Sequence, residues 1–125
     1  MFPRATRALK RSFMPPSDKE LIVYSRSTPC PFVSVARRVL EREGVPYREL
    51  LIDRNKTYEA RVLEWTGFLS VPTLVIAWRG QELPYEPPAP LPRGESPRGI
   101  DRGSMLTEAT EEELLAWLRK HGFLT

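Results

Sequence analysis

The sequence is poor in residues that build disulfides and metal sites, and it has no long apolar run. Its 125 residues include one cysteine, Cys30, and one histidine, His121. A lone cysteine excludes a disulfide within the chain, and with a single histidine it argues against a zinc site. No apolar stretch approaches the roughly 20 residues of a transmembrane helix, so we expect no membrane partner. With disulfides and zinc sites set aside, the free thiol of Cys30 is the reactive group that remains.

Positive charge gathers at the start of the chain, although the net charge is only +3. We expect residues 1–18 to be a basic disordered tail, or an artefact of a start site that belongs at Met14, because they lack the long apolar centre of a secretory signal. Without a signal we expect a cytoplasmic protein, where an unpaired thiol is stable. Elsewhere acidic and basic residues are interspersed, which argues against a nucleic-acid partner. The basic residues before the first acidic residue, Asp18, are Arg4, Arg7, Lys10 and Arg11.

The length suits one domain, which we place at residues 19–125. The pattern of apolar residues predicts the order strand, helix, strand, helix, strand, strand, helix. The first half has the form of a parallel βαβ unit, and the last two strands that of a hairpin. We therefore predict an α/β fold with a four-stranded mixed sheet and helices on both faces. The predicted strands are 21–24, 48–52, 70–78 and 81–83, and the predicted helices are 31–43, 56–65 and one that follows a capping box at Thr110-Glu111-Glu112-Glu113.

A stretch rich in proline and glycine precedes the last helix. Residues 84–104 have no periodicity and predict a long loop with polyproline character. We take about 84–106 as an insertion in the domain. It covers the functional site, binds a partner, or does no more than connect its neighbours.

The thiol of Cys30 stands between a predicted strand and a predicted helix. A group at a helix N-terminus meets unpaired N–H groups and the positive end of the helix dipole. Both favour a thiolate over a thiol and so lower a cysteine's pKa. Pro31 suits the first helical position, because its missing N–H is not needed there. We predict that Cys30 is a nucleophile rather than a small buried apolar residue.

Val33 stands three residues after Cys30, where a dithiol oxidoreductase would carry a second cysteine. Valine cannot resolve a mixed disulfide, so an external thiol must release any adduct of Cys30. The same side chain can also pack beneath the turn.

The sequence Val71-Pro72-Thr73 opens the third predicted strand. A proline there can hold a cis peptide bond, although a trans proline is also permitted at the start of a strand. We favour the cis form, which would aim the backbone N–H and C=O of Val71 outward to pair with an extended thiol substrate.

Basic and aromatic side chains lie close to Cys30 in the sequence. Arg26 either stabilises a thiolate or holds a substrate carboxylate, or it is simply solvated. Arg37 and Arg38 fit a solvated helix face better than a site. Phe32 offers an apolar contact to a partner, or else belongs to the core.

Three segments together resemble the glutaredoxins of the thioredoxin-like superfamily. They are Tyr-Ser-Arg-Ser-Thr-Pro-Cys-Pro-Phe-Val at 24–33, Gly-Val-Pro-Tyr at 44–47 and Thr-Gly-Phe-Leu-Ser-Val-Pro-Thr-Leu-Val at 66–75. The resemblance covers about residues 20–76 well and the final helix loosely. It implies a thioredoxin-like fold, a cis Pro72, and thiol–disulfide exchange with glutathione or a similar low-molecular-weight thiol.

The resemblance also implies roles for individual residues. Cys30 would be the nucleophile, and the backbone of Val71 would pair with the thiol substrate. Arg26 would approximate the family's basic residue that meets the glycine carboxylate of glutathione. Substrate contacts would come from Pro31, Phe32 and Pro72, with Asp101 and Ser104 as weak substitutes for the residues that hold the γ-glutamyl end.

The sequence leaves three hypotheses for function. The first is a monothiol oxidoreductase, monomeric or weakly dimeric, whose partners are a low-molecular-weight thiol and a protein disulfide. The second is a non-catalytic binding module whose loop arginines contact a protein. The third is an iron–sulfur carrier in which Cys30 of two chains and two external thiols ligate the cluster; it is not favoured, because the cluster-binding relatives have Gly-Phe-Ser where this chain has Pro-Phe-Val. The loop arginines are Arg93, Arg98 and Arg102.

Overall fold

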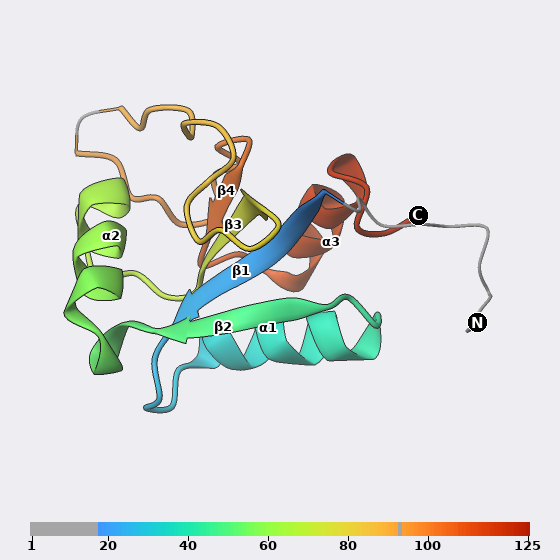
Figure 1. The fold of residues 1–125 in the computed structure, drawn as a ribbon, viewed down its shortest axis with the longest axis horizontal. Helices are drawn as coiled ribbons and strands as arrows, with labels where there is room; N and C mark the ends of the chain where they lie inside the picture. Colours follow the sequence, from blue (N-terminus) through green and yellow to red (C-terminus); the bar gives the residue numbers. More distant parts are fainter. Residues whose placement is uncertain (1–17, 93) are drawn as a thin grey trace.

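Strands and helices alternate through residues 18–92 and 94–125, which are the residues that the computed structural model describes (Figure 1). The predicted tail lies outside the described residues except for Asp18, and so does Arg93. The elements are β1 (Lys19–Ser25), α1 (Pro31–Arg42), β2 (Tyr47–Leu51), the short 3-10 helix η1 (Ile52–Arg54), α2 (Lys56–Thr66), β3 (Thr73–Trp78), β4 (Met105–Thr107) and α3 (Glu111–Lys120).

The strands form one four-stranded mixed sheet in the order β2-β1-β3-β4. β1 is parallel to β2, whereas the β1–β3 and β3–β4 pairs are antiparallel. Tyr24 near the end of β1 faces Thr73 at the start of β3. The carboxyl end of β1 and the amino end of β3 therefore meet at the same edge of the sheet, and the α1 that follows β1 begins there.

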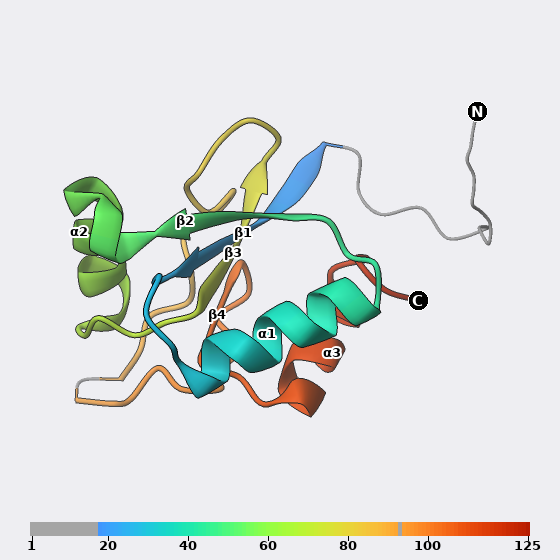
Figure 2. The same ribbon diagram turned by 90° about the horizontal axis from the view of Figure 1, so that it is seen from below.

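Helices cover both faces of the sheet, as the sequence predicts. Figure 2 shows α1 and α3 together on one side and α2 apart from them. In β1, Leu21 and Val23 join the core beneath α1 and α3, while Ile22 and Tyr24 join the core beneath α2. Burial on both faces explains why the central strands are continuous apolar runs rather than alternating ones. The predicted α/β fold is confirmed.

The helix ends follow local signals in the sequence. Asn55 caps α2 by accepting from the N–H groups of Thr57 and Tyr58, and Gly67 ends the helix in a left-handed conformation at φ 80°. The predicted capping box of α3 is present, since Thr110 and Glu113 bond each other's backbone N–H groups. No helix in the described part of the chain is long and apolar enough to cross a membrane.

The predicted strand at residues 81–83 is wrong. Those residues adopt no strand, and the fourth strand is β4, which begins at Met105 inside the range assigned to the insertion. Ile76 shows the cause, because its N–H donates to Ser104 O at 3.0 Å and its carbonyl accepts from Tyr85 N at 2.8 Å. The chain turns away after β3, and a later segment completes the sheet.

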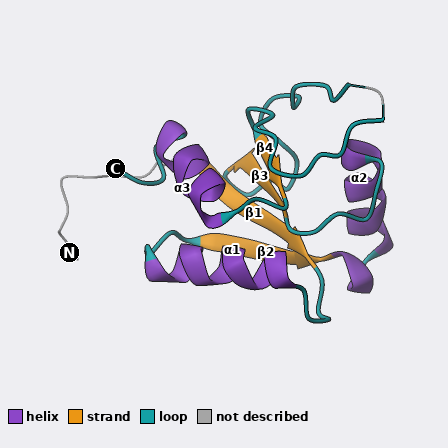
Figure 3. Cartoon of the chain, turned by 180° about the vertical axis from the view of Figure 1, so that it is seen from behind, coloured by secondary structure: helices purple, strands orange, loops and turns teal. Residues whose placement is uncertain are grey.

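The segment between β3 and β4 has no helix or strand among its described residues (Figure 3), yet partly buried hydrogen bonds hold it in place. The Arg102 side chain is only 7% exposed. Its Nε donates to Ala89 O at 2.7 Å, and its Nη1 donates to Trp65 O at 2.6 Å. Burial lowers the pKa of Arg102. Arg102 therefore ties the loop to the end of α2, which corrects its assignment as a contact for a partner protein.

Replacing Arg102 with alanine should destabilise the fold, because it leaves the carbonyls of Ala89 and Trp65 without their donor. Each buried polar group left unsatisfied costs about 1–3 kcal/mol, so we expect a loss of about 2–4 kcal/mol in the free energy of unfolding. Urea unfolding monitored by circular dichroism measures it. Arg54→Ala, the same change at an exposed position, is the control, and equal losses in both variants would show that Arg102 does not anchor the loop.

Candidate functional site

Cys30 lies at the turn between β1 and α1 and is the N-cap residue of the helix. Its backbone is extended, with φ −154° and ψ 124°, and Pro31 occupies the first helical turn. The Cys30 carbonyl accepts from Ser34 N at 3.0 Å, while the cysteine side chain makes no capping hydrogen bond. The first turn of α1 contains no acidic residue. The positive end of the helix dipole is therefore not neutralised within that turn.

The structure brings Cys30 next to Val71 and Pro72. The Sγ atom of Cys30 is 3.8 Å from the carbonyl oxygen of Val71. The Val71–Pro72 peptide bond is cis, which confirms that prediction. Cys30 is half-buried, so its sulfur lies at the boundary between the core beneath α2 and solvent.

The site contains one thiol, and Val33 belongs to the buried apolar cluster against which Cys30 packs. Val33 is 1% exposed and belongs to the same apolar cluster as Ile22, Tyr24 and Val75. Cys30 is the only cysteine of the chain. Among the described residues, no three histidine, cysteine, aspartate or glutamate side chains gather as potential metal ligands.

Arg26 and Ser27 hold the turn that carries Cys30. Arg26 Nη2 donates to Pro29 O at 3.0 Å, and its buried Nε has no hydrogen-bond partner in the described structure. Ser27 donates its N–H and hydroxyl to Asp53, and the hydroxyl bond in particular lowers the pKa of that carboxyl group. Arg26 thus lies within the turn, as its place in the sequence indicates, and bonds a backbone carbonyl there.

Phe32 meets a residue that the sequence did not assign to the site. The Arg98 guanidinium carbon lies 4.9 Å from the centre of the Phe32 ring. Arg98 Nη2 is also 3.7 Å from Glu108 Oε2, and the Glu108 N–H donates to Pro72 O at 2.9 Å. Glu108 is the one non-glycine residue with positive φ among those described, at 47°. Arg98 therefore contacts Phe32 and Glu108 bonds Pro72, although no local pattern marks either residue.

Asp101 and Ser104 lie away from the thiol. Ser104 is fully buried, and its hydroxyl donates to Glu86 O at 2.8 Å. Its carbonyl pairs with Ile76, so it sits well along β3 from Val71. Asp101 accepts from Gly103 N at 2.9 Å and from Lys120 Nζ at 2.7 Å, at the far end of α3. The structure does not bring these two residues to Cys30.

Arg37 and Arg38 of α1 make ion pairs away from the turn. Arg37 Nε donates to Glu49 Oε2 at 2.9 Å, and Arg38 Nη2 lies 3.5 Å from Glu111 Oε1. Neither makes a described contact with Cys30. Their pairs link α1 to β2 and to α3.

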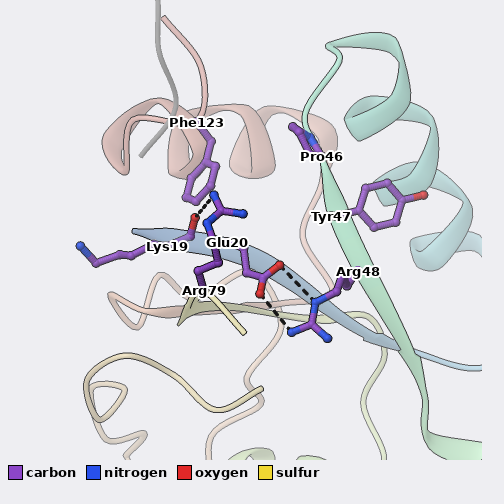
Figure 4. Close-up of a pocket in the computed structure, with 7 residues that line it drawn as sticks. All are labelled: Lys19, Glu20, Pro46, Tyr47, Arg48, Arg79 and Phe123. Atoms are coloured by element: carbon purple, nitrogen blue, oxygen red, sulfur yellow. Dashed lines mark hydrogen bonds and ion pairs between the residues drawn. The ribbon is translucent and has the colours of Figure 1, made fainter. Parts of the chain in front are cut away.

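A shallow pocket lies at the opposite end of β1 from Cys30 (Figure 4). Its polar groups bond one another, since Arg48 Nε and Nη2 each lie 3.1 Å from a carboxylate oxygen of Glu20. The Gly80 N–H donates to Glu20 at 2.6 Å, and this bond is the main reason that the pKa of Glu20 is lowered, followed by Arg48. The pocket lies where the ends of neighbouring strands meet, and none of its side chains is a nucleophile of the kind that Cys30 provides. Its lining residues are Lys19, Glu20, Pro46, Tyr47, Arg48, Arg79 and Phe123.

A comparison with known protein families finds a match for the part of the chain that contains Cys30. Residues 21–80 match the family described as Glutaredoxin. Among curated proteins, none matches the chain. The match runs from β1 to just past β3 and includes Cys30, Val71 and Pro72. With the mixed sheet and its helices, it identifies a thioredoxin-like fold and supports a redox role in general terms.

The lowered pKa of Glu20 predicts how its contribution to stability depends on pH. A carboxylate with a depressed folded pKa stabilises the fold above its unfolded pKa, and the effect is lost as pH falls through the folded value. We expect Glu20→Gln to lose about 1–2 kcal/mol at neutral pH, and its deficit against the wild type to shrink as the pH falls below about 4.5. Urea unfolding across that range measures both. A deficit independent of pH, or one matched by the exposed control Glu64→Gln, would contradict the assignment.

Proposed function

Residues 21–80 of this chain match the glutaredoxin family, and on that premise we propose that the protein catalyses thiol–disulfide exchange by a monothiol mechanism through Cys30. The observation that carries the proposal is the position of the Cys30 sulfur, half-buried at the first turn of α1 and 3.8 Å from Val71 O. Glutathione, or another low-molecular-weight thiol, is the co-substrate.

The reaction consists of two exchanges at one sulfur. The Cys30 thiolate attacks the glutathione sulfur of a mixed disulfide, the bond between the two substrate sulfurs breaks, and the departing thiolate takes a proton. Cys30 is then joined to glutathione through a new disulfide. A second glutathione thiolate attacks this adduct, releases oxidised glutathione, and returns the electron pair to Cys30. The substrate thiol leaves in its reduced form, and the glutathione of the mixed disulfide leaves joined to the second glutathione as oxidised glutathione.

The surroundings of Cys30 suit these steps. The first turn of α1 contains no acidic residue that would repel an anion at Cys30. Val33 fills the position from which a second thiol could attack, so the adduct waits for a thiol from solvent. This packing supports a monothiol mechanism over a dithiol one.

Substrate contacts are assigned to the residues that surround the sulfur. The backbone of Val71 pairs with the bound thiol peptide as a short added strand, and Pro31, Phe32 and Pro72 form the apolar border. Arg26 turns its Nη2 donor from Pro29 O to meet a substrate carboxylate. Asp101 and Ser104 have no part in this proposal, since their polar groups are engaged elsewhere.

Replacing Cys30 with serine should reduce turnover to background, because a hydroxyl is not ionised at neutral pH and cannot attack a disulfide. The assay follows reduction of a glutathionylated peptide by glutathione, with oxidised glutathione measured through glutathione reductase and NADPH. Ala116→Ser, at an exposed position on α3, is the control and keeps wild-type activity. Turnover that survives in Cys30→Ser, or a wild type inactive with glutathione and other small thiols alike, would refute the proposal.

A further inference from the structure

The proline-rich segment places a cation beside Phe32, which lies two residues after Cys30 in the chain. After residue 93 the segment passes through Arg98 and enters β4 at Met105. The Arg98 guanidinium lies over the ring of Phe32, 4.9 Å from its centre. Phe32 is two residues from Cys30 in the chain, so Arg98 lies at the border of the candidate site.

The backbone at Arg98 is fixed by its neighbours. Gly99 N donates to Thr107 O at 2.7 Å, and Arg98 forms a parallel bridge with Thr107. Gly99 has φ +73°, and a Cβ atom there would lie 2.8 Å from the Glu113 carboxylate. That carboxylate accepts from Thr110 N at 2.8 Å in the capping box of α3, so it is not free to move away. Gly99 therefore lets the segment lie against α3 and sets the position of Arg98.

The Arg98 side chain keeps capacity for a further anion. Its contact with Glu108 is a long one, at 3.7 Å, and the Arg98 side chain is 60% exposed whereas that of Glu108 is 17% exposed. Exposed pairs of this kind contribute little to stability. A guanidinium presents five N–H donors in a planar fork that matches a carboxylate, so a bidentate substrate contact can replace the loose pair.

We propose that Arg98 is a specificity-determining residue that selects disulfides bearing a carboxylate near the reacting sulfur. The inference deepens the proposed function and rests on Cys30 being the reacting thiol. Arg98 binds the carboxylate of the incoming disulfide, while Phe32 holds the guanidinium by a cation–π contact. The segment between β3 and β4 thus contributes the group that distinguishes anionic from uncharged substrates.

Two disulfide reagents, one anionic and one uncharged, test this directly. In each case the Cys30 thiolate attacks one sulfur, forms a mixed disulfide, and releases one coloured thiolate, so the rate needs no second thiol. Dithiobis(nitrobenzoate) carries a carboxylate on each half, whereas dithiodipyridine is uncharged. We expect Arg98→Ala to slow the anionic reagent about tenfold, which corresponds to about 1.4 kcal/mol, and to leave the rate with the uncharged reagent unchanged.

Matched variants separate local recognition from general charge effects. Arg98→Lys keeps the charge and should retain most of the preference, while Arg98→Glu should lower the rate with the anionic reagent further. Glu108→Gln removes the competing carboxylate and should raise that rate. Arg119→Ala deletes one positive charge at an exposed position in the last turn of α3 and should leave the ratio of the two rates as in the wild type.

The outcomes distinguish the two proposals. If Cys30 of the wild type reacts with neither reagent, the proposed function fails and this inference fails with it. If both reagents react and Arg98→Ala alters neither rate, or lowers both equally, the role of Arg98 is overturned while the proposed function stands. Loss of the anionic preference in Arg119→Ala as well would also overturn it, because the effect would then come from net charge.

Discussion

The site depends on the antiparallel pairing of β1 with β3. This pairing sets Tyr24 opposite Thr73, so the chain leaves β1 toward Cys30 at the same edge where it enters β3 from Pro72. The 3.8 Å contact between Cys30 Sγ and Val71 O follows from that register. A shift of one residue would turn each side chain of β1 to the opposite face of the sheet and disrupt both cores. The packing that stabilises the fold therefore also fixes the distance between the thiol and the backbone beside it.

Two arginines of the proline-rich segment have opposite environments and opposite consequences. Arg102 is buried and bonds the carbonyls of Ala89 and Trp65, and removal of such a donor leaves partly buried carbonyls without it. Arg98 is exposed and makes one loose ion pair with Glu108. The buried arginine gives the loop a definite path, and that path brings the exposed one to Phe32. An irregular segment can thus position a side chain reproducibly when its backbone groups bond the sheet and the helices.

The sequence predicted the elements that local signals define. Pro31 marked the start of α1, the Thr110–Glu113 capping box marked α3, and the apolar run of β3 marked a buried strand with a cis proline at its entrance. β4 was missed because its 3 residues are too few to show a period. Arg98 and Glu108 were missed for a related reason, since hydrogen bonds between distant parts of the chain determine where the loop runs. Asp101 and Ser104 were expected near the substrate for lack of the same information, because the path of the loop takes both residues away from Cys30.

Val33 and Arg98 together determine what kind of chemistry the site can support. Val33 is packed into the core, so no thiol of this chain can attack an adduct on Cys30 from within. Both the disulfide that forms the adduct and the thiol that removes it must then approach from solvent past the same border. A cation fixed at that border acts on each approach, because charge near a reacting centre steers the arrival of charged partners as well as their binding. In a dithiol enzyme the second exchange is internal and needs no approach from solvent; with a single thiol both exchanges pass this cation.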